Sequence, residues 1–259
     1  MAGFFRKGVG WKLRKNFYAV MRGYLNRRAL RRVRTARSRP SSDGVLQQQL
    51  KASLVRSRSS IQTDQMAEVR AGALAILGVF DILAERVGFS YQLAYGTLLG
   101  AIRHGGFIPW DDDIDVSMTT SDLERFIAAA HHLPEELVLL RMNKNFWKLM
   151  DRYSIISKDG KRGIALDIFL LEEEGQRLEF INVHRYAYQS LERADVFPVQ
   201  RVPFAQADCT LPVPARPERV LETIYRNWRQ LPPEDQRVSP HLGREVKVRR
   251  YDEEPFHPL

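Results

Sequence analysis

Cysteine and long apolar runs are both scarce in this sequence, and each shortage excludes a class of protein. Cys209 is the only cysteine among 259 residues, so no disulfide can form within the chain and a disulfide-stapled secreted scaffold is excluded. No run of 18 or more apolar residues occurs, so no segment is predicted to span a membrane as a helix. Disorder of the whole chain is also excluded, because 44% hydrophobic residues are enough to fill a core.

Acidic residues are missing from the first 40 positions, which divides the charge of the chain into two parts. Residues 1–40 contain 13 Lys and Arg and no Asp or Glu. The other 27 basic residues and all 31 acidic residues lie in 41–259, so the net charge of +9 combines a +13 arm with a −4 body. This division removes nucleic acid as the default partner of the body.

The basic arm, residues 1–40, has the pattern of an amphipathic helix. Its apolar stripe recurs at helical spacing and contains Leu13, Phe17, Val20 and Tyr24. A basic helix with aromatic residues on its apolar side suits an anionic membrane surface, so we expect a cytoplasmic protein with peripheral contact to the inner face of the membrane. A solvated tail, an organelle transit peptide and a nucleic-acid-binding segment are the alternatives.

Composition also divides the rest of the chain. Residues 41–63 are rich in Ser, Gln and Arg and are predicted to be a linker, with a helical turn around Val45 to Val55. The globular domain is expected at 64–236, and the polar, Pro-containing segment 237–259 is expected to be a loose C-terminal tail.

A glycine turn opens the most informative segment of the body. Residues 89–95 alternate as a strand does, Gly96 interrupts the pattern, and Thr97 begins a short predicted helix that ends at Arg103. A helix that starts in this way presents free backbone N–H groups and the positive end of its dipole, a geometry that accepts phosphate. Alone this is weak evidence, because most such turns are only turns.

Four carboxylates follow within five residues, at Asp111, Asp112, Asp113 and Asp115. Asp113 and Asp115 alternate with apolar residues, so a strand would place both side chains on one side, close enough to share a cation. Oxygen ligands of this kind suit Mg²⁺ or Mn²⁺. A solvated acidic loop is the alternative, but the carboxylates run directly from Trp110 into an apolar strand, which favours a metal site.

A further carboxylate, Asp167, stands alone in the apolar run 163–171. An acid within a buried strand is costly unless it is paired or binds a metal, so the alternative to a metal ligand is a salt bridge to Arg152 or Arg162. A glycine turn, an Asp-x-Asp strand and a later Asp on a second strand occur in this order in nucleotidyltransferase-fold enzymes. We therefore predict an α/β fold with a small mixed sheet and flanking helices.

The segment from Tyr95 to Val116, YGTLLGAIRHGGFIPWDDDIDV, resembles the signature of the LicD family. This family contains phosphocholine transferases related to the fukutin-type polyol-phosphate transferases and to the nucleotidyltransferase superfamily. The resemblance covers roughly residues 66–235 and includes the motif that begins at Asp167. Leu170 stands where the family has Pro, and Arg226 stands where it has Gly.

The resemblance implies transfer of a phospho-substituent from a CDP-linked donor to a hydroxyl of a cell-surface glycan, which is often lipid-linked. It implies that Asp113, Asp115 and Asp167 are catalytic and bind the metal, with Asp167 as the general base and Asp111 as a further metal ligand.

The resemblance also implies substrate-binding residues near the glycine turn. Gly96 and Thr97 would hold the donor phosphate, and Arg103 and His104 would neutralise charge, although His104 is equally well explained as a structural histidine. Trp110 is either a core residue or part of an aromatic wall for a quaternary ammonium group.

Two other functions fit the same residues. Nucleotidyl transfer to a small acceptor would use the same carboxylates. A non-catalytic membrane-associated protein could keep the fold, but the intact carboxylates argue against it.

Overall fold

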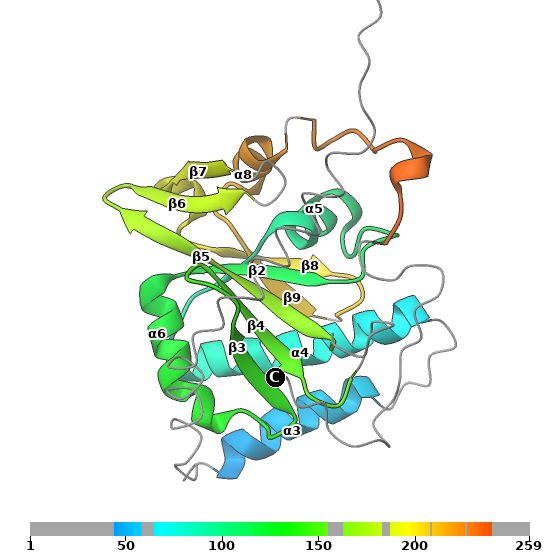
Figure 1. Ribbon diagram of the computed structural model, residues 1–259, viewed down its shortest axis with the longest axis vertical. Helices are drawn as coiled ribbons and strands as arrows, with labels where there is room; N and C mark the ends of the chain where they lie inside the picture. The colour runs from blue at the N-terminus through cyan, green and yellow to red at the C-terminus, as the bar shows by residue number, and fades with distance from the viewer. Residues whose placement is uncertain are drawn as a thin grey trace, which may run out of the picture.

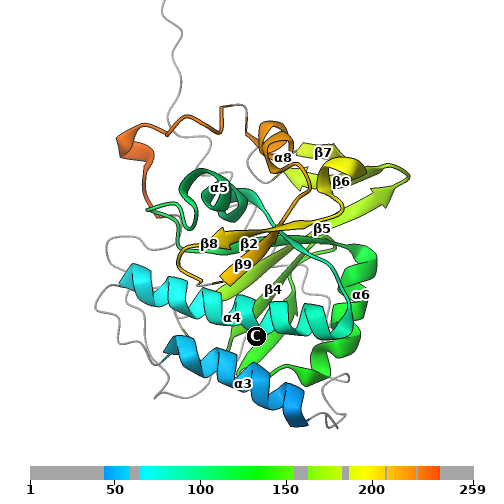
Figure 2. The ribbon, with the colours of Figure 1, turned by 180° about the vertical axis from the view of Figure 1, so that it is seen from behind.

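The computed structural model describes residues 44–58, 65–154, 163–182, 187–207, 209–225 and 227–239. Within these ranges the chain forms a mixed sheet with helices on both of its sides (Figures 1 and 2). The predicted α/β class with a mixed sheet is therefore confirmed. The predicted basic arm, residues 1–40, lies outside the described residues.

The main sheet is built around one parallel pair of strands. Its order is β1 (Gln92–Leu93), β2 (Ile114–Thr119), β5 (Ala165–Glu174), β4 (Phe146–Asp151) and β3 (Leu137–Arg141). The β2–β5 pair is parallel and the other pairs are antiparallel. The far end of β5 also pairs with β6 (Arg177–Asn182), which pairs with β7 (Ala187–Glu192). Outside this sheet, β8 (Gln200–Phe204) and β9 (Cys209–Val213) form a two-stranded sheet.

One side of the sheet is apolar along its parallel strands β2 and β5 and at Leu149 of β4. Its side chains alternate along three strands and include Ile114, Val116, Met118, Leu166, Ile168 and Leu149, all of them fully buried. Helix α4 (Gln65–Val87) packs against this side, and α6 (Thr120–Ala129) packs beside it. Gly72 lets α4 approach closely, because a Cβ at this position would lie 2.7 Å from Cδ1 of Ile164.

Helix α3 (Gly44–Arg58) corrects the predicted boundary of the domain. The segment was expected to be a linker, yet it forms a 15-residue helix that lies along α4 (Figure 2). Leu46, Leu50 and Leu54 repeat every four residues and are buried in the core. Ser, Gln and Arg dominate the rest of the helix, so composition concealed a narrow apolar stripe.

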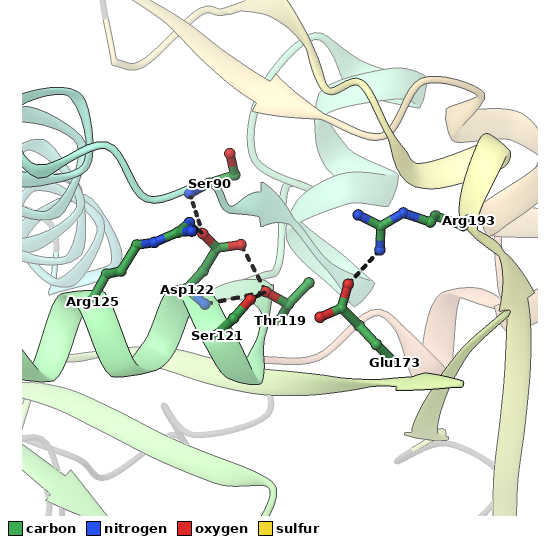
Figure 3. A network of polar contacts seen from close by, with 7 residues as sticks. All are labelled: Ser90, Thr119, Ser121, Asp122, Arg125, Glu173 and Arg193. Carbon is green, nitrogen blue, oxygen red and sulfur yellow. Dashed lines mark hydrogen bonds and ion pairs between the residues drawn. The ribbon is translucent and has the colours of Figure 1, made fainter. Parts of the chain in front are cut away.

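Helix α6 begins directly after β2, and a polar network fixes this junction (Figure 3). The Thr119 hydroxyl accepts a hydrogen bond from the backbone N–H of Asp122, which is the usual form of an N-cap. The Asp122 carboxylate accepts bonds from the Thr119 hydroxyl, the Ser90 backbone N–H and the Arg125 guanidinium. A 3₁₀ turn, Ala130–His132, then leads toward β3.

Two helices lie over the other side of the sheet. Helix α5 (Tyr95–His104) packs on β2, and α8 (Pro217–Ile224) packs on α5 (Figure 1). The short helix α7 (Arg193–Val196) contacts α8, and a 3₁₀ turn, Glu234–Gln236, follows later in the chain. The strand expected over 89–95 is only two residues long, Gln92–Leu93, and α5 begins at Tyr95 rather than at Thr97.

Replacing Leu50 by Ala tests whether α3 belongs to the domain. Leu50 is fully buried, so the Leu50→Ala variant should lose about 2–5 kcal/mol of unfolding free energy. Val45 is 65% exposed on the same helix, and Val45→Ala should change it by less than about 0.5 kcal/mol. Urea unfolding of both variants measures this difference, and equal stabilities would show that α3 is not part of the cooperative unit.

Candidate active site

The parallel pairing of β2 and β5 brings two predicted carboxylates together. Asp115 and Asp167 are direct neighbours in the register of the pair. Both side chains point to the side of the sheet that α5 partly covers, because their chain neighbours Ile114, Val116, Leu166 and Ile168 are buried on the opposite side. Residues 52 positions apart in the sequence thus form one carboxylate pair.

The Asp111–Asp113 turn supplies further carboxylates just before β2. Carboxylate oxygens of Asp111, Asp112 and Asp113 can all lie within 4.8 Å of one another. Asp111 and Asp112 are 8% and 3% exposed, so this segment is not the solvated acidic loop considered as the alternative. Asp112 accepts a hydrogen bond from the Ser239 hydroxyl, which gives it a partner in the C-terminal segment.

Burial and mutual repulsion make these carboxylates resist ionisation. The pKa of Asp115 is well above its ordinary value because the group is desolvated and faces Asp113, Asp167 and Asp111. The pKa of Asp111 is raised to about 6, chiefly by burial and also by Asp112, although hydrogen bonding with Asp113 and the charge of Arg70 oppose this rise. An added cation would relieve both effects.

The donor set fits a hard divalent cation. The grouped ligand atoms of Asp111, Asp112 and Asp113 are carboxylate oxygens, as are those of the neighbours Asp115 and Asp167, and Mg²⁺ and Mn²⁺ prefer such ligands. Asp113, Asp115 and Asp167 are the residues that would hold the ion, with Asp111 beside them. These roles remain predictions, and the repulsion among the carboxylates is the observation that supports them.

Lys148 forms the salt bridge that was considered for Asp167. It lies opposite Asp167 on β4, and its Nζ is 2.5 and 2.7 Å from the two carboxylate oxygens. Of the two arginines expected for this role, Arg152 donates to the Glu135 carbonyl and Arg162 lies outside the described residues. The sequence placed Lys148 within a generally basic span, and only the strand register singles it out.

The start of α5 lies against the Asp111 carboxylate. A Cβ on Gly96 would lie 2.7 Å from an Asp111 carboxylate oxygen, so a larger residue would displace that group. Tyr95, the first residue of the helix, has a φ of +41°, a strained value for a residue with a side chain. The packed turn therefore brings the N-terminus of α5 to the carboxylates.

Thr97 links α5 to β2. The residue is 1% exposed, and its hydroxyl accepts a hydrogen bond of 2.8 Å from the backbone N–H of Asp115. The side chain therefore holds β2 against α5. A phosphate contact at Gly96 and Thr97 stays a prediction.

Arg103, His104 and Trp110 lie at the C-terminal end of α5. The Arg103 guanidinium donates to the carbonyls of Trp228 and Gln230, and burial lowers its pKa. Partial burial lowers the pKa of the His104 ring, and the charge of Arg103 lowers it further. The ring lies edge-on to Trp110. Trp110 is half-buried against the core, as the core alternative expected. The structure does not bring these three residues into the carboxylate group.

Two contributors to the site carry no recognisable signal in the sequence. Arg70 on α4 donates to the carbonyls of Asp111 and Ile108, at 2.8 and 2.7 Å, and so holds the turn before β2. Tyr225 follows α8, and burial together with the charges of Asp115 and Asp111 raises its pKa well above the ordinary value. Both come from helices far from the aspartates in the chain, and only the tertiary structure reveals them.

Carboxylates on two parallel strands beside a helix N-terminus define a nucleotidyltransferase-type domain. Residues 88–216 match the family model described as LicD/FKTN/FKRP, nucleotidyltransferase domain. This domain of the chain belongs to that family, and the matched range contains every aspartate discussed above.

Curated relatives support the same assignment. The chain is 38% identical over 117 residues to the lipopolysaccharide cholinephosphotransferase LicD of Haemophilus influenzae, covering 41% of the chain and 44% of the relative. It is 42% identical over 55 residues to the human ribitol 5-phosphate transferase FKRP, covering 21% of the chain and 10% of the relative. An uncharacterized Rickettsia prowazekii protein is 22% identical over 178 residues, or 65% and 62% of the two chains. The chain thus spans less than two thirds of each of these relatives.

Replacing Arg70 by Gln tests its role in holding the turn before β2. The Arg70→Gln variant loses two hydrogen bonds from a charged donor, so it should lose about 2–4 kcal/mol of unfolding free energy. Arg86→Gln, at an exposed position of the same helix, is the matched control and should cost less than about 1 kcal/mol. Denaturant unfolding checks both variants, and equal losses would contradict this role.

Proposed function

We propose that this protein is a metal-dependent transferase that moves phosphocholine or a polyol phosphate from a CDP-linked donor to a hydroxyl of a cell-surface glycan. The observation that carries the proposal is the register of β2 and β5, which sets Asp115 beside Asp167 next to the start of α5. The names of the LicD and FKRP relatives supply the two classes of phosphate substituent.

Different groups of the site have different proposed roles: metal binding, phosphate binding and proton transfer. Asp113, Asp115 and Asp167 would hold Mg²⁺ or Mn²⁺, which when bound offsets negative charge on the donor diphosphate. The backbone at Gly96 lies where the helix N-terminus favours an anion. Asp167 is the carboxylate proposed to take the proton of the acceptor hydroxyl as its oxygen attacks the phosphorus and CMP leaves.

A CMP-release assay tests this function directly. The full chain is incubated with Mg²⁺, a glycan acceptor and each of CDP-choline, CDP-ribitol and CDP-glycerol. We expect CMP from one of the donors, and a loss of at least about 100-fold in Asp115→Asn because the charge that holds the cation is removed. Asp235→Asn, at an exposed position in the Glu234–Gln236 turn, should keep the wild-type rate.

Labelling the cytidine separates the alternatives. Label released as CMP supports transfer of the phospho-substituent, whereas label on the acceptor would show nucleotidyl transfer. If none of the three donors releases CMP and the protein binds no Mn²⁺, the non-catalytic alternative is correct and the proposal fails.

We also propose that residues 1–40, the basic arm, bind the surface of a membrane. None of the helices in the described part of the chain is both long and apolar enough to cross a membrane. The arm carries 13 basic residues without an acid, so it should draw the protein to anionic vesicles.

Vesicle co-sedimentation of the full chain and of a variant lacking residues 1–40 tests this contact. We expect the full chain to pellet with anionic vesicles and much less with neutral ones, and the shortened chain to stay in solution. Equal pelleting of both forms would end the membrane proposal.

A further inference from the structure

Lys148 is a cation held against the carboxylate pair. It lies on β4 directly opposite Asp167, and its Nζ contacts both carboxylate oxygens, at 2.5 and 2.7 Å. The Nζ also lies 5.2 Å from the centre of the Phe146 ring, close enough for a cation–π contact. The Lys148 and Asp167 side chains are 28% and 13% exposed, so water screens this pair only in part.

The position of Lys148 is unusual for a structural ion pair. The side of the sheet around it carries Asp115 next to Asp167, with Phe146 and Phe169 stacked one step further along the strands. The Arg70 guanidinium donates to the backbone carbonyls of Asp111 and Ile108, in the turn before β2. Lys148 therefore places positive charge on an oxygen pair that a bound metal would also need.

We propose that the Lys148 ammonium binds the Asp167 carboxylate when no divalent cation is bound. When the cation binds, the ammonium moves to the phosphate of the donor. This inference rests on the proposed function, because it uses the same metal and donor. It adds a role for a residue outside the aspartate motif.

Repulsion between two cations at Asp167 favours a movement of Lys148. Both oxygens of Asp167 are in contact with the ammonium, and a metal ion on either oxygen would lie within about 4 Å of it, where two positive charges repel strongly in a partly buried site. The lysine stem is flexible, so Nζ can leave Asp167 while the backbone of β4 stays in register. A donor diphosphate bound at the same metal would give the ammonium a new anionic partner.

Manganese binding to the full chain, measured without donor, tests the first half of the inference. Lys148→Met removes the competing cation, so Mn²⁺ should bind roughly tenfold more tightly than to the wild type. Lys148→Arg restores a positive charge and should return the affinity toward the wild-type value. Lys144→Met is the matched control, because Lys144 pairs with Glu172 in a more exposed salt bridge, and it should leave Mn²⁺ affinity unchanged.

A structural ion pair predicts the opposite result. If Lys148 only supported the fold and the cation did not use the Asp167 oxygens, Lys148→Met would lower stability, and Mn²⁺ affinity would stay the same or fall with it. Either result overturns the inference. Wild-type protein that binds Mn²⁺ and releases CMP, with Lys148→Met showing no tighter binding, would leave the proposed function intact. Wild-type protein that binds no Mn²⁺ would overturn both.

Two more measurements keep the test decisive if Lys148→Met folds poorly. Acetylation of Lys148 in the wild type, followed by mass spectrometry, should become faster when Mn²⁺ is added because the ammonium leaves its ion pair; an unchanged rate overturns the inference. In the CMP-release assay, Lys148→Met should raise the KM for the donor about tenfold or more. An unchanged KM would overturn the phosphate half alone.

Discussion

The parallel pairing of β2 and β5 is the constraint on which the rest of the site depends. It sets Asp115 beside Asp167 and, by the same register, places Val116 beside Ile168 on the opposite side of the sheet. A slip of one residue would turn the carboxylates into the apolar layer and the apolar residues toward the site. The packing of α4 and α6 against the apolar side therefore fixes the register that the carboxylates need.

The fold surrounds the clustered carboxylates with several compensating contacts. Burial and mutual repulsion raise the pKa of Asp115, and leaving such groups without a partner would cost several kcal/mol. Lys148 pairs with Asp167, Arg70 donates to the backbone of the turn, and the N-terminus of α5 faces Asp111. Each contact offsets part of the charge, so the group can persist in the absence of a metal.

Sequence patterns predicted the parts of the site that follow from local periodicity. The strand that carries Asp115, the second strand that carries Asp167 and the helix start at Gly96 follow from strand period and glycine conformation, which are local properties; Asp113, expected on the same strand as Asp115, lies just before β2. The patterns predicted only a helical turn around Val45 to Val55 where α3 forms, because its three buried leucines are too few to outweigh the Ser and Gln around them. They also did not reveal that the Thr97 hydroxyl holds the Asp115 backbone.

Contacts between distant segments could not be predicted, because they depend on the tertiary structure and not on a local pattern. Nothing near Lys148 in the chain singles it out from the neighbouring basic residues, and its importance comes from lying across the strand pair from Asp167. The choice of Lys148 over Arg152 depends on strand register, which no local pattern in a single sequence specifies.

The site also extends beyond the segment that defines the family. Residues 88–216 contain the aspartates, yet Arg70 precedes this range and Tyr225 follows it. Helix α4 thus performs two tasks, covering the apolar side of the sheet and fixing the turn before β2 through Arg70. Since α3 packs along α4 and buries its leucines there, the stability of the N-terminal helices and the geometry of the carboxylates are physically linked. A domain cut at the family boundary would keep every aspartate and lose the arginine that positions their turn.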